Sequence, residues 1–596
     1  MPAINPVTGI LEYQPGVRKG SRLVTSLGGQ APAFLTPLVI GGAYEGYPYN
    51  ANSLKYSSEN DIPFYHTHGT AESLADENGW GCPIHTFARY AKRTGLPLIH
   101  AVCASALTRA SILVTSTGPV NQFTIYATKF GAPGSHIKLA FDGTNFTIVP
   151  LKSFAMLSAN LSSSGLRMYI AGVDPLSWVA IGKTYWIGDN NSTDEEFVVR
   201  DMGYEINTSG QKQWWIDLTT STGTAYAVND YAMIWEYEGA AGTLTSPDIG
   251  AGQGQVLIDW INSTAYKHVR AHRHANFTGV VPITAATLTP LKEISAWGTA
   301  TAGTSPAATN TDYQAITTLL SGTGLTDFMS AVGTYPYVYG VAENSSTIHG
   351  TMADYAAAQR SEGRPLTVIT GCRYTDVDTA ASDDTNPIYR ANALGSQDMV
   401  LCAGQVDRIE PSLSLAGEAL GAIVAADVGG DITRDRVAYT YVGKRWTSTE
   451  LTALLRGGVL TYAPSRGKLG DTAFLYRFAQ DVNTYPGGRD GAYVTGTSVP
   501  VTGLGQTRRL LDYINAVMGE AAEPYVAAAT VTRATLASHI MAQGKRLLFD
   551  RGLVTEPVTI NSIARDTTGT VWEVTPRVKI TGPNHFINVV TFIVAE

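Results

Sequence analysis

Charged residues are scarce in this chain. Asp, Glu, Lys and Arg make up 15% of its 596 residues, whereas an ordinary soluble domain carries roughly 25%. The 42 basic and 50 acidic residues leave a formal net charge of −8. This balance argues against a nucleic-acid-binding protein, which is usually basic, and the 44% hydrophobic content excludes a disordered chain. Because a free monomer normally keeps more surface charge, we expect other copies of the chain to cover part of the surface.

Cysteines are few, and long apolar runs are absent. Cys82, Cys103, Cys372 and Cys402 lie far apart without a CxxC pair, which is typical of buried, reduced thiols rather than of disulfides or a zinc site. No run of eighteen apolar residues predicts a transmembrane helix. The first residues lack a basic segment followed by an apolar one, so we expect no secretory signal.

Recognisable catalytic motifs are missing as well. The sequence has no GxSxG elbow, no P-loop and no GxGxxG turn between a strand and a helix. Four aspartates follow an apolar strand, where α/β sheets often place ligand loops, but their spacing does not fit a calcium loop and favours a solvated loop. They are Asp376, Asp378, Asp383 and Asp384. We expect no cofactor, no metal and no enzymatic activity.

Two sets of histidines have a spacing at which imidazoles can converge on a metal. They are His66 with His68, and His268 with His272 and His274. No carboxylate or cysteine accompanies them at ligand spacing, and arginines adjacent to the second set would repel a cation. We therefore favour polar positions in β-structure.

The first hundred residues predict an extended arm followed by an α/β layer. Residues 1–20 are rich in Pro and Gly and lack sustained periodicity. Between residues 62 and 93, around AESLADENG and CPIHTFARYAKRTG, apolar residues recur at helical spacing. The continuous apolar run at 96–106 is typical of a strand buried on both faces.

Residues 107–300 predict antiparallel β-modules. Short runs rich in Val, Ile, Thr and aromatic residues, such as NQFTIYATKFG and KQWWIDLTT, each end at Gly, Asn, Asp or Pro. The Thr, Ala, Ser and Gly of residues 299–311 predict a linker. Helix–strand units follow, with a helical break at Gly322 and Gly324, and their alternation predicts a largely parallel sheet.

The last hundred residues predict amphipathic helices and two strands. The helix QTRRLLDYINAVM carries one apolar stripe: Leu510, Leu511, Ile514, Val517 and Met518. A second helix carries Leu536, Ile540, Leu547 and Leu548. VWEVTPRVKI alternates apolar and polar residues, and Pro576, which lacks a backbone donor, places this strand at a sheet edge. HFINVVTFIV (585–594) is apolar on both faces and must be buried in a sheet of this chain or of a neighbour.

Several segments, in this order, resemble the contractile-tail sheath proteins of bacteriophages. They are YQPGV, FYHTHG, FARYAK, LPLIHAVCASA, GAPGSHIKL, TDYQAITTLL, MADYAAAQRSEGRPLTVITG, ALGAIVAADVGGDITRDRVAYTYVG and QTRRLLDYINAVM to the end. The resemblance spans most of residues 300–596 and part of 1–150. Residues 150–255 have no counterpart, and we expect them to be a variable insertion on the outer surface.

The resemblance implies a fold and a division of the chain. The expected fold class is an α/β (α+β) sheath core with inserted antiparallel β-rich domains and extended N- and C-terminal arms. The expected parts are an N-terminal arm (1–20), a first part of the core (21–106), the inserted β-rich domains (107–300), the remaining core (301–500), a C-terminal inner domain (501–580) and a C-terminal arm strand (581–596).

The resemblance also implies a function and partners. Copies of the chain would form stacked hexameric rings in a helical sheath around an inner tail tube, and the sheath would contract without nucleotide. Further partners would be baseplate and tail terminator proteins, with no nucleic acid and no membrane insertion. The protein would belong to the virion and assemble in the cytoplasm of the host bacterium.

Two sets of site residues follow from the resemblance. Arms that exchange strands between subunits would use Ile10, Tyr13, Val17, Phe586, Ile587, Val589, Val590, Phe592, Ile593 and Val594. The inner tube would be contacted by Lys545, Arg546 and Arg551. The alternative for these three is that they solvate a helix end.

Other functions stay open at this point. A virion-associated carbohydrate-binding or carbohydrate-active protein would use an aromatic platform, for which the candidates are Trp214, Trp215, Tyr185 and Trp186, although aromatic residues in a β-core are the favoured interpretation. A tail-fibre or capsid decoration protein would be largely β, which the α/β half argues against.

Overall fold

The structure of the chain is a computed structural model. It describes residues 35–579 apart from gaps at 57–58, 60–61, 116–119, 172–176, 208–211, 251–252, 280–283, 373–384, 405, 407–410, 427, 429, 434, 436, 438–443, 467–473, 486–502, 523–531 and 566–571. The four aspartates at 376–384 lie outside the described residues. So do all predicted arm contacts: Ile10, Tyr13, Val17, Phe586, Ile587, Val589, Val590, Phe592, Ile593 and Val594.

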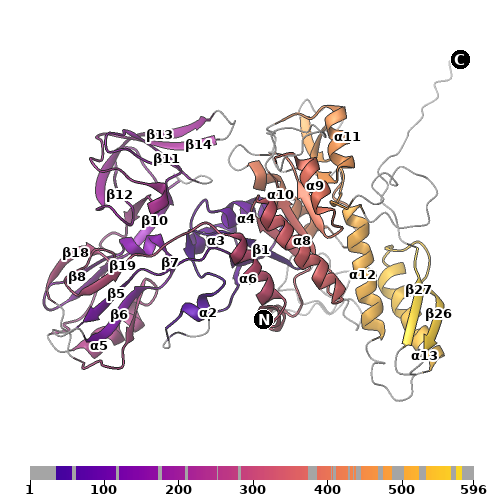
Figure 1. The fold of residues 1–596 in the computed structure, drawn as a ribbon, viewed down its shortest axis with the longest axis horizontal. Coiled ribbons are helices and arrows are strands. Elements are labelled where there is room, and N and C mark those ends of the chain that lie inside the picture. The colour runs from indigo at the N-terminus through magenta and orange to yellow at the C-terminus, as the bar shows by residue number, and fades with distance from the viewer. Residues whose placement is uncertain are drawn as a thin grey trace.

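A seven-stranded sheet lies at the centre of the elongated molecule (Figure 1). Its order is β23–β22–β21–β20–β1–β4–β3, and all neighbours are parallel except β3 and β4. The strands are β1 (Pro37–Gly41), β3 (His66–His68), β4 (Ile99–Cys103), β20 (Val338–Ala342), β21 (Thr367–Gly371), β22 (Met399–Cys402) and β23 (Val459–Leu460). The alternation of helices and strands predicted this parallel sheet correctly.

Helices cover both faces of the sheet, so its strands are apolar on both sides. In β1, Val39 packs towards the face under α4 and α10, whereas Leu38 and Ile40 pack towards α6, α7 and α8. β4 is buried along its whole length, as its apolar run predicted. The helices are α3 (Ala71–Asn78), α4 (Pro83–Thr94), α6 (Asn310–Leu320), α7 (Thr323–Val332), α8 (Ser346–Ser361), α9 (Pro387–Leu394), α10 (Pro411–Ala425) and α11 (Ser448–Arg456).

Sequence signals for helix ends are confirmed in part. Thr70, Thr309 and Thr447 each cap a helix through a capping box. The predicted break at Gly322 separates α6 from α7, but Gly324 lies inside α7, where a Cβ would press on the ring of Phe64. Gly324 is therefore a packing residue and not a helix breaker.

The four cysteines are buried free thiols, as predicted. Burial raises the pKa of the Cys82 thiol to about 12. No helix among the described residues is long and apolar enough to span a membrane.

A first β unit, residues 111–149 and 244–301, leaves the core after β4 and consists of two four-stranded antiparallel sheets around one apolar cluster. One sheet has the order β17–β6–β5–β19 and the other β16–β9–β8–β18. The elements are β5 (Ser111–Thr115), β6 (Asn121–Ala127), η1 (Ala132–His136), β8 (Lys138–Phe141), β9 (Phe146–Val149), β16 (Leu244–Thr245), α5 (Gly254–Trp260), the π-helix η3 (Ile261–Ala265), β17 (Val269–Arg273), β18 (Ala286–Pro290) and β19 (Gly298–Thr301).

A second β unit, residues 151–237, is inserted into the first (Figure 1). Its antiparallel six-stranded sheet has the order β10–β15–β12–β13–β14–β11. The elements are β10 (Leu151–Met156), β11 (Arg167–Ile170), β12 (Thr184–Gly188), β13 (Glu195–Ile206), β14 (Lys212–Leu218), η2 (Val228–Asp230) and β15 (Met233–Tyr237). The short runs of Val, Ile, Thr and aromatic residues in this region predicted β-structure correctly.

The predicted linker at 299–311 is wrong at its start and at its end. Residues up to Thr301 belong to β19, which pairs with β5, and Thr304 still bridges to Thr108. Asn310 already begins α6. The small Thr and Ala residues were ambiguous because they suit an edge strand as well as a loop.

A C-terminal unit follows the long helix α12 (Gly505–Ala522) at the other end of the molecule (Figure 1). The stripe of α12 is confirmed: Leu510, Ile514 and Val517 are buried. Leu536 and Ile540 of α13 complete the apolar contact between the two helices. The elements are α13 (Arg533–Gly544), the π-helix η6 (Lys545–Phe549), β26 (Thr559–Arg565) and β27 (Trp572–Arg577).

Short elements complete the fold. A two-residue pair ties the core to the first β unit, and a hairpin follows β23. They are α2 (Ala51–Leu54), β2 (Glu45–Gly46) with β7 (Phe130–Gly131), and β24 (Tyr462–Arg466) with β25 (Phe474–Phe478).

Glycines bring α4 and α10 into close contact. A Cβ on Gly417 would lie 2.7 Å from Cβ of Tyr90, and one on Gly421 would overlap the carbonyl oxygen of Ala91. The short distance lets the Thr94 hydroxyl donate to the carbonyl oxygen of Glu418 at 2.6 Å. The core face of the sheet therefore depends on these two positions having no side chain.

We predict that Gly421→Ala destabilises the core by about 1–3 kcal/mol, because the added methyl group must push two packed helices apart. Hydrogen exchange of the α4 and α10 amides measures the change. Gly350→Ala in α8 is the matched control, since nothing lies within 4 Å of its Cβ position, and it should stabilise its helix slightly. Equal protection in the two variants would contradict the prediction.

Candidate functional site: a buried arginine–aspartate network

The first turns of α12 are buried on every side, although they carry three charged residues. Arg508, Arg509 and Asp512 are 9%, 1% and 1% exposed. Burying charges is costly unless they are paired and hydrogen-bonded. The polar side of this helix therefore contacts the core, which an amphipathic stripe alone does not indicate.

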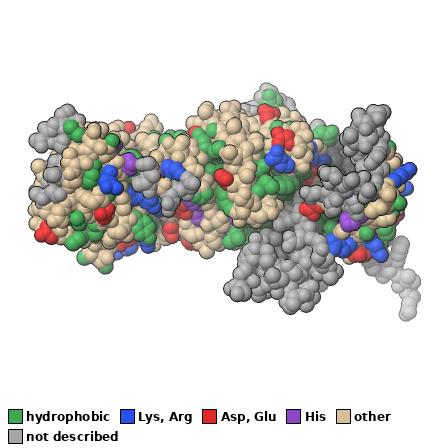
Figure 2. Space-filling model, turned by 90° about the horizontal axis from the view of Figure 1, so that it is seen from below, with side chains coloured by type: hydrophobic (Ala, Val, Ile, Leu, Met, Phe, Trp, Pro, Cys, Tyr) green, Lys and Arg blue, Asp and Glu red, His purple; other side chains and the backbone are tan. Residues whose placement is uncertain are grey.

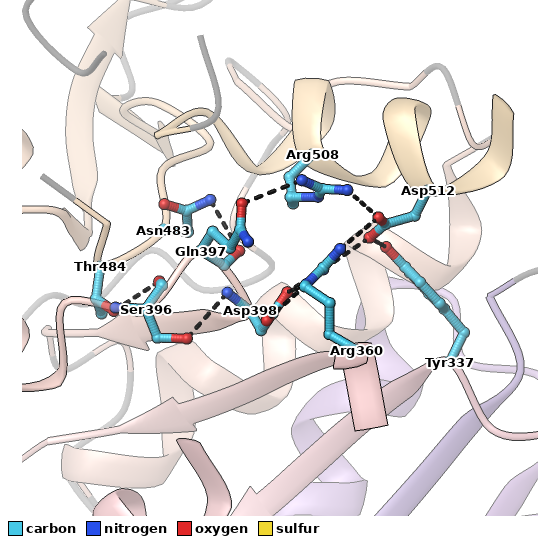
Figure 3. Close-up of polar contacts among 9 residues, drawn as sticks. All are labelled: Tyr337, Arg360, Ser396, Gln397, Asp398, Asn483, Thr484, Arg508 and Asp512. Carbon is cyan, nitrogen blue, oxygen red and sulfur yellow. Dashed lines mark hydrogen bonds and ion pairs between the residues drawn. The ribbon is translucent and has the colours of Figure 1, made fainter. Parts of the chain in front are cut away.

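Asp512 is the centre of a network that joins α12 to the parallel sheet (Figure 3). Arg360, at the end of α8, donates from Nη1 to Asp512 Oδ1 at 2.8 Å and from Nη2 to Oδ2 at 3.1 Å. The Tyr337 hydroxyl, just before β20, donates to Asp512 Oδ2 at 2.8 Å. Arg508 donates to the same carboxylate one helical turn away. One buried carboxylate therefore accepts from three side chains, which come from α8, from the segment before β20 and from α12 itself.

Arg360 also binds Asp398, the residue before β22. Its Nε lies 3.0 Å and 2.9 Å from the two carboxylate oxygens of Asp398. Gln397 accepts from Arg508 Nη1 at 3.1 Å and, through its carbonyl oxygen, from Asn483 at 3.0 Å. Figure 3 shows these side chains converging from α8, the β22 entry and α12. The network spans segments that are more than 100 residues apart.

The charges in the network compensate each other. Two guanidinium groups, Arg360 and Arg508, face the carboxylates of Asp398 and Asp512. Burial alone would lower the pKa of Arg360, but the hydrogen bonds to both aspartates raise it. Burial also raises the pKa of the Tyr337 phenol, and the Asp512 charge adds to the increase. Arg360 and Tyr337 therefore stay protonated donors to Asp512.

A second buried pair holds the start of the same helix. Arg509 Nη2 lies 2.6 Å from Asp481 Oδ2 and donates to the carbonyl oxygen of Gly430 at 3.1 Å. Both side chains are 1% exposed. Gly505 begins α12 where a Cβ would overlap the Asp481 carboxylate. Together the two clusters fix the direction in which α12 leaves the sheet.

Sequence reasoning missed this site. Arg508 and Asp512 stand at i and i+4 within the helix, a spacing that also occurs on solvated faces. The signal that could have found them is a charged pair interleaved with the apolar stripe residues Leu510, Leu511 and Ile514. Arg360 and Asp398 belong to distant elements, and only the fold brings them together.

α/β proteins usually bind ligands beyond the carboxyl ends of the strands, but in this protein other segments of the same chain occupy that position. The strand order reverses between β1 and β20, and ligands bind beyond the carboxyl ends of the strands at such a point. A Cβ on Gly42 would contact Ser105 Oγ at 3.4 Å and Ala308 Cβ at 3.9 Å. Ser105 accepts from the Ala43 amide at 3.1 Å. Ser105 and Ala308 lie in the two connections to the first β unit, so the insertion itself covers this edge.

The histidine sets make contacts within the chain. Glu77 lies 3.3 Å from His66 Nδ1 and 3.6 Å from His68 Nδ1, and burial lowers the pKa of both histidines. His274 Nε2 is 2.8 Å from Thr124, and its ring packs edge-on against His272. Across the described ranges, no three or more His, Cys, Asp or Glu side chains gather in a metal-binding group.

The aromatic platform of the carbohydrate alternative does not form. Trp214 and Trp215 are neighbours in β14 and point to opposite faces of the sheet. Trp214 packs against the core of the second β unit, and the Arg167 guanidinium lies 4.1 Å from the centroid of Trp215. Tyr185 is buried in that core, and Trp186 packs in a separate cluster. The interpretation as β-core residues is confirmed for Tyr185, and a shared stacking surface is ruled out.

The three predicted tube-contact residues lie around η6. Lys545 is exposed. Arg546 donates to Gln543 Oε1 at 2.6 Å, and Arg551 donates to the Tyr513 hydroxyl of α12 at 2.6 Å. Arg551 thus supports the packing of η6 on α12, and Lys545 is the residue of the three that extends into solvent.

The chain is similar to several proteins whose structures have been solved. No protein-family model matches the sequence, and no curated protein matches it. The chain is similar to a sheath tail protein from Desulfitobacterium hafniense, with 13% identity, a TM-score of 0.47, and coverage of 92% of this chain and 96% of the other. It is also similar to a sheath tail protein from Listeria innocua, with 11% identity, a TM-score of 0.45, and coverage of 95% and 99%.

A third similarity is to the helical sheath of the anti-feeding prophage in its contracted state. The identity is 13% and the TM-score 0.34, with coverage of 50% of this chain and 78% of the other. These three structures are two sheath tail proteins and one helical sheath in its contracted state.

We predict that Asp512→Asn lowers the stability of the α12 contact by about 3 kcal/mol, because Arg508 loses its charged acceptor and Arg360 keeps only Asp398. Hydrogen exchange of the α12 amides should show a corresponding loss of protection. Asp354→Asn on the exposed side of α8 makes the same chemical change without burial and should leave the protection unchanged. Full protection of α12 in Asp512→Asn would show that the network does not hold the helix.

Proposed function

We propose that the chain is the structural subunit of a contractile tail sheath, which polymerises helically around an inner tail tube and contracts to drive the tube through the host envelope. The observation that carries the proposal is an open two-stranded sheet in the C-terminal unit. The apolar sequence HFINVVTFIV in the same chain is the strand that such a sheet can accept.

The acceptor is the β26–β27 sheet. Among the described residues these two strands pair only with each other, so no third described strand covers either edge. A two-stranded sheet is marginal by itself, and a third strand stabilises it. Pro576 weakens the hydrogen bonding of β27, consistent with its predicted place at an edge.

The donor is residues 585–594. Its side chains are apolar on both faces, and an exposed strand of this kind aggregates unless a sheet takes it up. If each copy donates this strand to the next, the contact is heterologous, and a rotation that does not close produces a helical tube. Six-fold stacking and further strands from Ile10, Tyr13 and Val17 follow from the sequence resemblance.

The arrangement of the fold supports this proposal. Segments that carry the resemblance, 64–106 and 311–371, build one sheet with its helices. Residues 151–237, which have no counterpart, form the second β unit at the far end from α12 (Figure 1). Such a position suits a variable insertion on the outside of a sheath.

Contraction in this proposal needs no bound nucleotide. Interfaces between subunits typically bury more than about 1,000 Å², and a lattice can store energy in an extended state that is released when the interfaces improve. The exchanged strands keep the subunits joined while they rotate. In this proposal the network around Asp512 couples the core to α12, so the C-terminal unit moves together with the core. Baseplate and tail terminator proteins would end the sheath in a virion that assembles in the host cytoplasm.

The tube contact is assigned to the basic surface of the C-terminal unit. Figure 2 shows Lys and Arg side chains on this unit, and further Lys and Arg side chains on the β units at the opposite end of the molecule. Lys545 is exposed there, and Arg546 is half-buried beside it. Electrostatic attraction between a basic patch on the sheath and an acidic surface on the tube would fix how the sheath is aligned on the tube.

We predict that the purified protein forms uniform hollow cylinders, visible by negative-stain electron microscopy, and that deletion of residues 585–596 leaves soluble monomers. The physical reason is that the deletion removes the donor strand but no residue of the described core. Deletion of residues 152–236, the second β unit, is the control and should leave cylinders. Cylinders that persist unchanged without residues 585–596 would refute strand exchange.

We predict that Lys545→Glu reduces co-sedimentation of the sheath with the tube protein while cylinders still form alone. The substitution reverses one charge at an exposed position of the tube surface. Lys183→Glu in the second β unit is exposed as well and should leave the co-sedimentation unchanged. An identical effect of both substitutions would remove Lys545 from the tube contact.

A further inference from the structure

A buried ionic cluster lies where the second β unit rests on the first. His136 ends η1 in the first unit, Asp194 precedes β13 in the second, and Lys292 follows β18 in the first. Asp194 Oδ1 is 3.0 Å from His136 Nδ1 and 2.9 Å from Lys292 Nζ. The three side chains are 0%, 2% and 3% exposed. One carboxylate of the second unit is therefore held by two groups of the first.

The surroundings of His136 are tight. Its ring packs on Trp235 of β15 with 4.2 Å between centroids, and the Tyr237 hydroxyl donates to its carbonyl oxygen at 2.8 Å. A Cβ on Gly188 would lie 2.9 Å from the Trp235 ring and would overlap Asp194. The absence of a side chain at Gly188 lets the imidazole, the indole and the carboxylate meet.

Lys292 adds hydrogen bonds to the backbone of the second unit. Its Nζ donates to the carbonyl oxygens of Asp189 and Ser192, the latter at 2.8 Å. Asn190 donates to the carbonyl oxygen of Gly303 at 2.6 Å. The loop before β13 is thus fixed to the first unit through polar contacts, which depend on the charge state of the cluster.

The contacts of His136 use only one of its two ring nitrogens. Nδ1 faces Asp194 and donates to it, while Nε2 is buried without a hydrogen-bond partner in the described part of the chain. A proton on Nε2 would put a second cation beside Lys292 in a site without water contact. The remaining charged groups nearby are Glu293, 3.5 Å from Lys292, and Lys138, whose ammonium lies over Trp186. Among the described residues, neither Glu293 nor Lys138 forms a hydrogen bond with Nε2 of His136.

The second unit has a hinge. Its connections to the first unit are Pro150 on one side and residues 238–243 on the other, and the Glu238 amide donates to the Pro150 carbonyl oxygen at 2.9 Å. Two adjacent connections allow the whole unit to swing when its other contacts weaken.

We propose that His136 is an acid-sensitive latch: the second β unit separates from the first about the Pro150 hinge when the imidazole takes up a proton. The step is a proton uptake from solvent at Nε2 and needs no other reactant. It is independent of the sheath assignment, because it concerns two units of one chain.

The direction of the pH dependence follows from the buried state. Burial lowers the pKa of His136, although Asp194 acts in the opposite sense. In the separated state the imidazole is solvated, with an ordinary pKa of about 6.5. The separated state therefore binds the additional proton below about pH 6.5, and the docked state loses about tenfold in relative population per pH unit until its own pKa is reached. Docking is fully stable above that pH and weakens as the pH falls.

The test uses the full chain and hydrogen exchange of residues 132–138 and 188–195 between pH 8 and pH 4.5, referred to amides of β20 and β21 at each pH. We expect the relative protection of both segments to fall by up to tenfold per unit below about pH 6.5. His136→Asn keeps a neutral donor near Nδ1 and should make the relative protection independent of pH. His274→Asn, in the first β unit, should behave like the unmodified chain.

Fluorescence provides a second measurement that does not depend on the folding of a His136 variant. The emission of Trp235, taken as the difference between the chain and Trp235→Phe, should shift to longer wavelength on acidification in the same pH range, because the indole, buried in the docked state, meets water once the two units separate. Constant protection and constant Trp235 emission down to pH 4.5 would overturn the proposal. An equal loss of protection in His136→Asn would also overturn it.

Discussion

The carboxylate of Asp512 joins the core to the C-terminal unit at a point where their apolar side chains also pack together. It belongs to α12, the helix from which the C-terminal unit extends, and it accepts from Arg360 of α8 and from Tyr337 beside β20. A charge-assisted network of this kind is geometrically specific, because planar guanidinium groups bind carboxylates in few orientations. The direction of α12, and with it the position of β26 and β27, depends on that specificity.

A shared buried carboxylate also joins the two β units, but one of its partners there is a histidine. Between the two β units, His136 and Lys292 share the carboxylate of Asp194. Arg360 keeps its charge at every physiological pH, whereas an imidazole changes its charge near neutrality. One buried carboxylate thus supports a permanent joint, and the other supports a joint that depends on pH. The permanent joint lies between the core and the C-terminal unit, and the sensitive joint lies between the two β units.

Much of the fold could be predicted from local patterns. The apolar run around Val102 predicted a strand covered on both faces, and the regularly spaced short runs of Val, Ile, Thr and aromatic residues from 107 to 300 predicted antiparallel sheets. The predicted linker at 299–311 was misjudged because Thr301 and its neighbours suit a strand, a turn and a linker alike. The network at Asp512 could not be predicted, because its partners on α8 and before β22 lie more than 100 residues away.

The scarcity of charge, the two-faced strand at 585–594 and the order of the resembling segments are properties of the sequence itself. They determined the α/β class, the inserted β-structure and the expectation of a polymer, because composition and periodicity act locally along the chain. Only the tertiary structure decided which charges are buried. Arg508 and Lys545 look alike in the sequence, yet one is held by Asp512 and the other is exposed. Their difference arises from what distant segments place beside them, and that is a property of the fold.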